Sequence, residues 1–82
     1  MVIAAVRLFA RAKELAGTDK MVFELVAGAT VQDLRDRLRH NSPALAPFLE
    51  RCAIAINCEI AKDTTVLPDK VEVAILPPVS GG

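Results

Sequence analysis

Alternating apolar and polar positions along the chain predict four strands, and one longer segment has helical spacing. In the strand-like segments, apolar residues recur at every second position, so that one face can be buried. In the helical segment, Val31, Leu34 and Leu38 form a narrow apolar stripe. The predicted strands are 2–9, 20–26, 52–57 and 70–76, the predicted helix is 31–40, and the predicted core-facing strand residues are Val2, Ala4, Val6, Leu8, Met21, Phe23, Leu25, Ile54, Ile56, Val71, Val73 and Ile75.

The order of these segments predicts an α+β fold. A short helical turn over 10–16 stops at Gly17, and the three-residue linker 17–19 favours antiparallel pairing of the first two strands. The first and last strands can then pair in parallel at the centre of a mixed four- to five-stranded sheet. The fifth strand would be a short edge strand within 59–68, and a broken helical turn is expected around Pro47. One main helix would pack across one face of this sheet.

The predicted helix has clear start and stop signals. Thr30 is a suitable N-cap, and Asp33 at the third helical position gives a near variant of the capping box. The sequence Asn41-Ser42-Pro43 ends the helix. We expect Asp33 and Arg37 to form an i,i+4 ion pair. Because acidic residues are interleaved with the arginines, the polar face is interpreted as solvated; it comprises Gln32, Asp33, Arg35, Asp36, Arg37 and Arg39.

Composition narrows the class of protein. A chain of 82 residues with 52% hydrophobic residues can bury one core. Ten basic residues balance ten acidic ones, which argues against binding nucleic acid through bulk phosphate attraction. The opening residues lack a signal-peptide pattern, and the longest apolar run is too short for a membrane span. We therefore expect a cytoplasmic protein with neither a nucleic-acid nor a membrane partner.

The side chains offer little conventional chemistry. Cys52 and Cys58 would lie about 20 Å apart on a single strand at roughly 3.3 Å per residue, so a disulfide would require a turn between them. With His40 they are too few for a structural zinc or iron–sulfur site, and no metal is expected. His40 is interpreted as a helix C-terminal residue, and Cys58 as an ordinary thiol rather than a nucleophile. No serine triad or phosphate-binding loop is present.

The C-terminal sequence Pro77-Pro78-Val79-Ser80-Gly81-Gly82 is the most distinctive motif. It could be a frayed end or an expression remnant. Alternatively, two glycines without Cβ atoms form a slim tail that threads a narrow channel and presents its α-carboxylate to another protein. Activation to an acyl-adenylate would make that carboxylate an acyl donor. We expect a domain over 1–78 and a flexible tail over 79–82.

The chain resembles the MoaD-type sulfur carriers, the small subunits of molybdopterin synthase, in the ubiquitin-like β-grasp family. The PPVSGG ending is the most specific element and is not usual in the thiamin-pathway carriers. One departure is Lys70-Val71, where the family usually has Gly-Asp in a turn entering the last strand. The matching segments are VRLFARAKELAG at 6–17, TVQDLRDRL at 30–38, AIN at 55–57 and EVAILPPVSGG at 72–82.

The resemblance implies chemistry at Gly82. An E1-like enzyme, which itself binds the ATP, would adenylate the Gly82 carboxylate, and a sulfur donor protein would convert it into a thiocarboxylate. The tail would then donate sulfur to a pterin precursor in the large subunit during molybdenum cofactor biosynthesis, with Gly81 and Ser80 supplying reach. The chain would bind no cofactor, and it would be an enzyme only as part of a heterotetramer of two small and two large subunits.

Three other functions remain open at this point. The chain could be a sulfur carrier of another pathway or a ubiquitin-like modifier conjugated through Gly82, and it could also be a passive interaction module. For a carrier, a partner site is expected from an exposed apolar patch of Phe9, Ile60 and Leu76, although these residues could instead cap the edge of the core. Arg11 or Lys13 could add an ion pair at the rim. The expected partner-binding residues also include Pro77, Pro78, Val79 and Ser80.

Overall fold

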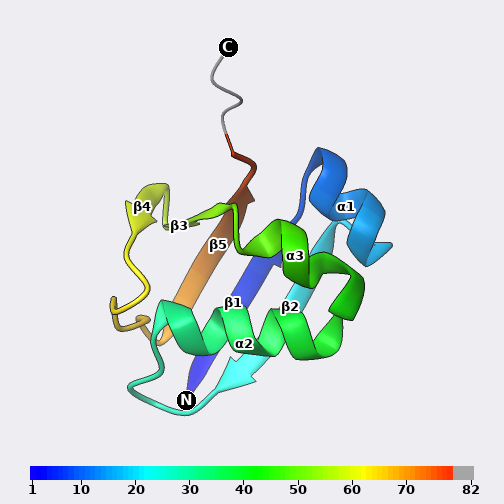
Figure 1. Cartoon of the computed structure of the whole chain (residues 1–82). Helices are drawn as coiled ribbons and strands as arrows, with labels where there is room; N and C mark the ends of the chain where they lie inside the picture. The colour runs from blue at the N-terminus through cyan, green and yellow to red at the C-terminus, as the bar shows by residue number, and fades with distance from the viewer. Residues whose placement is uncertain (79–82) are drawn as a thin grey trace.

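The computed structural model describes residues 1–78 and contains one five-stranded mixed sheet (Figure 1). Its strand order is β2-β1-β5-β3-β4. Strand β1 pairs in parallel with β5 and antiparallel with β2, and β3 pairs antiparallel with both β5 and β4. This confirms the predicted β-grasp arrangement, including the short edge strand. The strands are β1 Val2–Arg7, β2 Lys20–Leu25, β3 Ala53–Ile56, β4 Glu59–Ala61 and β5 Lys70–Leu76.

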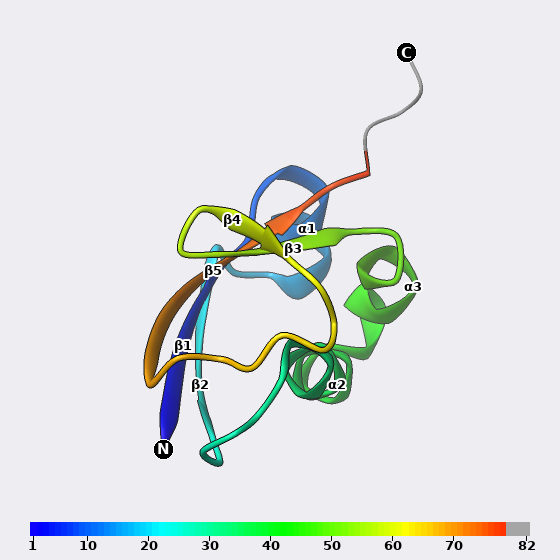
Figure 2. The ribbon, with the colours of Figure 1, turned by 90° about the vertical axis from the view of Figure 1, so that its left-hand side faces the viewer.

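Helices cover one face of the sheet. Helix α2 (Val31–Asn41) lies across that face, with α3 (Ala46–Leu49) beside it, while α1 (Ala10–Ala16) lies at one end (Figures 1 and 2). A 3-10 turn over Pro43–Leu45 joins α2 to α3, so the helical break predicted near Pro47 is confirmed. Gly17 ends α1 in the left-handed conformation with φ 77°, which glycine adopts without steric cost.

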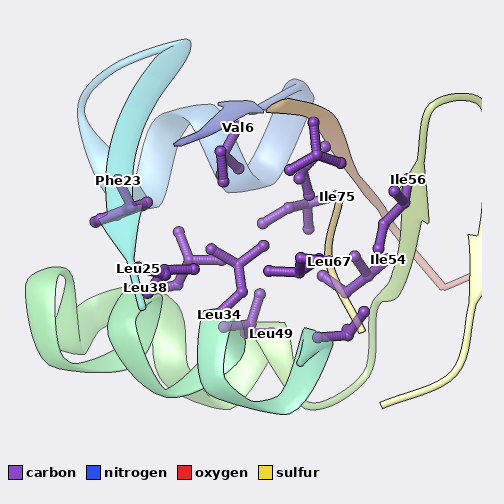
Figure 3. Close-up of a cluster of buried hydrophobic side chains, with 14 of the residues drawn as sticks. Val6, Phe23, Leu25, Leu34, Leu38, Leu49, Ile54, Ile56, Leu67 and Ile75 are labelled. Atoms are coloured by element: carbon purple, nitrogen blue, oxygen red, sulfur yellow. The ribbon is translucent and has the colours of Figure 1, made fainter. Parts of the chain in front are cut away.

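A single hydrophobic core lies between the sheet and these helices (Figure 3). The alternating strand residues predicted to point inward are buried, except Met21, which is half-buried. The stripe on α2 is completely buried, Leu45 and Leu49 add to the core from the 3-10 turn and α3, and Leu67 adds to it from the loop before β5. At about 25 cal/mol per Å² of apolar surface, this burial is the main stabilising contribution in so small a domain.

The N-terminus of α2 is tied to the loop that follows β4. The amide groups of Val31 and Gln32 donate to the carbonyl oxygens of Thr65 and Asp63, at 3.0 Å each. The Thr30 hydroxyl accepts from the Asp33 amide, while the Asp33 carboxylate accepts from the Thr30 amide, which confirms the predicted capping box. The first amide groups of the helix, which cannot bond within it, are thereby satisfied.

Arg35 does not lie on a solvated face, and that prediction is wrong. Its side chain is only 13% exposed, and its guanidinium donates to the carbonyl oxygens of Leu49 and Cys52 at 2.7 and 2.9 Å. A third bond, 2.8 Å long, reaches the Asp63 carboxylate. Arg35 therefore fastens α2 both to the segment entering β3 and to the loop after β4, because carbonyls from the end of α3 point towards it.

The predicted ion pair between Asp33 and Arg37 is also absent. The Asp33 carboxylate is engaged in the capping box, and the Arg37 guanidinium turns towards the sheet instead. It donates to the Glu24 carbonyl oxygen at 3.2 Å and lies 5.5 Å from the centre of the Phe23 ring. Arg37 thus contacts the edge of β2 from the adjacent helix.

The Lys70-Val71 pair, where a turn was in question, is extended. Lys70 is the first residue of β5, and Val71 is buried opposite Ala4 of β1. The Ile3 amide donates to the Asp69 carbonyl oxygen at 2.7 Å, which aligns the start of β5 with β1. The departure from the family sequence therefore leaves the central strand pair intact. Among residues 1–78, no helix is both long and apolar enough to cross a membrane.

We predict that Arg35→Met lowers the free energy of unfolding by roughly 2–4 kcal/mol. Methionine keeps much of the side-chain volume but leaves the carbonyl oxygens of Leu49 and Cys52 without their donor. Urea denaturation followed by circular dichroism measures the change.

The matched control is Arg39→Met on the same helix. Arg39 pairs with the exposed Asp36 carboxylate and, at 3.8 Å, with Glu50, so its loss should cost less than about 1 kcal/mol. Equal destabilisation by the two substitutions would contradict the role assigned to Arg35.

Candidate functional site

The face of the sheet opposite α2 carries apolar residues at the end where β5 finishes. Ile60 of β4 lies opposite Ala55 of β3, Ala55 opposite Ala74 of β5, and Ala74 opposite Arg7 of β1. These residues therefore form one row across the sheet, with side chains on the same face. Leu76 lies two residues beyond Ala74, at the end of β5.

Phe9 lies just beyond the sheet. It was predicted inside the first strand, but β1 ends at Arg7 and Phe9 is the N-cap of α1. Because Arg7 pairs with Ala74, continuing the parallel register places Phe9 next to Leu76. The Phe9 side chain is 49% exposed, and its carbonyl oxygen accepts bonds from the amides of Ala12 and Lys13. The turn into α1 thus fixes the backbone that presents this ring.

Ile60 projects from a tight hairpin. Asn57 and Cys58, the two residues between β3 and β4, both have positive φ values, 48° and 72°. This backbone resembles the type I′ turn, whose twist matches that of the flanking strands. The Asn57 carboxamide oxygen also accepts from the Glu72 amide at 3.1 Å, and the Asn57 amide donates to the Glu72 carbonyl at 2.9 Å. The hairpin is thus held against β5 and leaves Ile60 73% exposed.

The structure adds residues that sequence reasoning did not assign to the patch. The small side chains of Ala55 and Ala74 lie between the larger ones. The exposed Arg7 adds one positive charge beside Ala74. Arg7 follows the alternation of the first strand onto its outer face, so periodicity could have indicated it. We call this group the docking surface; it comprises Arg7, Phe9, Ala55, Ile60, Ala74 and Leu76.

The predicted patch of Phe9, Ile60 and Leu76 could instead cap the edge of the core. This alternative role fits Leu76 better than the other two residues. Leu76 is half-buried, whereas Phe9 and Ile60 keep much of their apolar surface in solvent. On α1, next to Phe9, Arg11 pairs with Glu14 at 3.3 Å and Lys13 is exposed. Arg11 also lines a pocket with Pro47 and Phe48 of α3, and the ion pair expected at the rim stays a prediction.

The last described residues leave the sheet beside this surface. Strand β5 ends at Leu76, and the exposed Pro77 and Pro78 follow directly. A proline has no amide hydrogen for the ladder, which accounts for the end of the strand. The predicted site residues Val79, Ser80, Gly81 and Gly82 lie outside the described residues.

The described side chains form no cluster suited to metal or thiol chemistry. Within residues 1–78, no group of three or more His, Cys, Asp and Glu residues could hold a metal ion. Cys52 and Cys58 are both free thiols. Burial raises the pKa of the Cys52 thiol, which donates to the Phe48 carbonyl oxygen at 3.2 Å. Cys52 is therefore a core residue, and Cys58 is a surface residue in the hairpin.

Known proteins share both the sequence pattern and the fold. The molybdopterin synthase sulfur carrier subunit of Chlamydomonas reinhardtii is 41% identical over 76 residues, covering 90% of this chain and 92% of that protein. Small archaeal modifier protein 1 from Methanosarcina acetivorans is 31% identical, with a TM-score of 0.81 and coverage of 100% of this chain and 98% of that one.

A third similar structure is a complex. In the protein–protein complex of subunits 1 and 2 of molybdopterin-converting factor from Helicobacter pylori, one chain matches with a TM-score of 0.72 and 27% identity. The match covers 99% of this chain and 100% of that chain. The sequence profile of the ThiS family matches residues 6–82, a range that includes the whole docking surface and the Gly-Gly ending. The chain therefore belongs to the ThiS family.

Proposed function

We propose that this chain is the sulfur-carrier subunit of a molybdopterin synthase and carries sulfur as a thiocarboxylate on Gly82. The observation that carries the proposal is the docking surface beside the point where β5 leads into PPVSGG. An exposed apolar patch marks a partner site, and here that site adjoins the tail that would enter the partner. Similarity to a sulfur carrier subunit over most of the chain supports the same function.

The proposed chemistry uses the main chain rather than a side chain. A carboxylate is a poor acyl donor, so the Gly82 carboxylate first attacks ATP bound by an E1-like enzyme to form an acyl-adenylate and pyrophosphate. Sulfur delivered at the sulfide level by a donor protein then attacks the acyl carbon, displaces AMP and leaves a thiocarboxylate. The chain itself binds no cofactor, and the pterin and its acid and base groups belong to the large subunit.

The proposal divides the work between the folded domain and the C-terminal tail. Residues 1–78 form the recognised domain, and residues 79–82 form the tail, in which Ser80 and Gly81 give reach to Gly82. Phe9, Ile60 and Leu76 would be the apolar anchors, because large buried side chains at an interface centre contribute most of its binding energy. Arg7 would orient the partner through charge. Pro77, Pro78 and Val79 would direct the tail into the large subunit.

The large subunit is the main proposed partner. The Helicobacter pylori complex of subunits 1 and 2 supports such a pair for this chain. We extend the proposal to a heterotetramer of two small and two large subunits, in which the activating enzyme and the large subunit use the docking surface in turn. Sequential use would require the surface to bind each partner reversibly.

A second candidate function is protein modification through Gly82. The similarity to a small archaeal modifier protein favours it, because that protein shares the fold over the full length of this chain. Isopeptide formation and thiocarboxylate formation would begin from the same acyl-adenylate. The two functions differ in the nucleophile, which is a lysine amine in one case and a sulfur donor in the other.

We predict that the full chain, incubated with its activating enzyme, ATP and a sulfur donor, gains the mass difference between oxygen and sulfur. Intact-mass spectrometry measures the shift, and fragmentation should place it on Gly82. Lysine conjugates in cell extract, without any thiocarboxylate, would instead support the modifier function and contradict the carrier function.

Deletion of Gly81 and Gly82 is the matched control for this reaction. We expect it to abolish the mass shift while leaving the melting temperature nearly unchanged, because the core lies within residues 2–75. A large fall in melting temperature would show that the tail has a structural role.

We predict that Ile60→Asp weakens binding of the large subunit by about tenfold or more, because a carboxylate would replace an apolar anchor. Isothermal titration calorimetry measures the affinity. Val26→Asp is the matched control, since Val26 is 79% exposed and lies beyond β2, away from the docking surface. Equal loss of binding by both variants, with both folded by circular dichroism, would contradict the assigned surface.

A further inference from the structure

Strand β2 forms one free edge of the sheet, because β1 is its single neighbour in the strand order. The register extends beyond β1 to Leu8 and Asp19, where the Leu8 amide donates to the Asp19 carbonyl oxygen at 2.9 Å. In an antiparallel ladder, such hydrogen-bonded pairs alternate with non-hydrogen-bonded pairs. The backbone groups of Met21, Phe23 and Leu25 therefore face β1.

The backbone groups of Lys20, Val22 and Glu24 consequently face away from the sheet. Two contacts agree with this assignment. The Lys20 amide and carbonyl both bond to the Thr18 hydroxyl, at 3.4 and 3.1 Å, and the Glu24 carbonyl accepts from Arg37 at 3.2 Å. The outward-facing groups form an edge of three residues, and Val22 is at its centre.

This edge is complementary to itself. When two copies of β2 align antiparallel about Val22, Val22 meets Val22, Lys20 lies opposite Glu24 of the second copy, and Glu24 lies opposite Lys20. The backbone groups of Lys20, Val22 and Glu24 all face outward. In this register they can therefore form the hydrogen bonds of an antiparallel ladder between the two copies. We propose that β2 is a homodimerisation edge at which two copies of this chain form a continuous ten-stranded sheet.

The side chains support this register on both faces. On the outer face, two Lys–Glu pairs flank Val22, which is 57% exposed in the single chain. On the inner face, Met21, which is half-buried in the single chain, lies opposite Phe23 of the second copy, whose ring is already buried. Opposite charges and apolar pairs placed directly across an antiparallel ladder each stabilise it.

Thr18 and Arg37 set the strength of this association. Their side chains occupy the outward-facing groups of Lys20 and Glu24, so a second copy must displace them. Natural sheets protect free edges from indiscriminate pairing in this manner. The contact also involves one short strand from each copy, which is small for a stable interface. The dimer is therefore weak and forms at high protein concentration.

The docking surface remains open in this dimer. Ile60 is on β4, the strand at the other edge of the sheet, and Leu76 is on the central strand β5. Two copies joined at β2 would therefore present two docking surfaces and two tails on one assembly. The inference is independent of the proposed sulfur-carrier function, because it depends on β2 and the two side chains that cap its edge, Thr18 and Arg37.

Charge reversal tests the register. Sedimentation velocity of the full chain, at concentrations up to about 1 mM, should show self-association. Lys20→Glu or Glu24→Lys alone places like charges opposite each other twice per dimer and should weaken association about tenfold. The double variant Lys20→Glu/Glu24→Lys restores both pairs and should recover association. The carboxylate introduced at position 20 also lies opposite Arg7 of β1, so the fold is retained.

Two further variants separate β2 from other surfaces. Arg37→Gln should strengthen association about threefold by releasing the Glu24 carbonyl. Ile60→Asp should leave it unchanged. A chain that is monomeric throughout the concentration range would overturn the proposal, and so would self-association that Ile60→Asp abolishes or that the two single charge reversals leave unchanged.

Discussion

The parallel pairing of β1 with β5 is the constraint on which the rest of the molecule depends. It joins the first and last strands of the described chain at the centre of the sheet, and each of the two hairpin partners, β2 and β3, attaches to one of them. Parallel strands finish at the same end, so Phe9, after β1, and Leu76, at the end of β5, become neighbours. The pairing of β1 with β5 thus determines both faces of the sheet: one face carries the core, and the other carries the docking surface.

The two faces of that sheet are built from different residues. The inner face carries branched side chains that pack under α2. On the outer face, the small side chains of Ala55 and Ala74 lie between the larger side chains of Ile60 and Phe9. Small side chains on paired strands, between larger apolar ones, form a surface suited to recognition by another protein. The described side chains form no metal cluster. Under the proposed function, the chemistry would be supplied by the partners that bind this surface.

Periodicity predicted the elements well because burial imposes it directly on the sequence. Val2, Val6 and Ile75 alternate because one side of a strand faces the core. The predictions that proved wrong concern side chains whose partners are distant in the sequence. Arg35 is held by carbonyls from Leu49 and Cys52, and Arg37 by a carbonyl of β2, and no local pattern reports such distant acceptors. At the docking surface, Phe9, Ile60 and Leu76 were predictable as outward apolar residues, but the alanines between them became visible only through strand register.

The central position of β5 has a consequence for how the protein is made. A ribosome delivers β5 after every other described element, so a chain that is still being synthesised holds two separate hairpins, β2-β1 and β3-β4, with no strand between them. Neither hairpin alone has enough partners to be stable in water. The docking surface, which spans β1, β5, β3 and β4, can therefore assemble only after β5 has been synthesised.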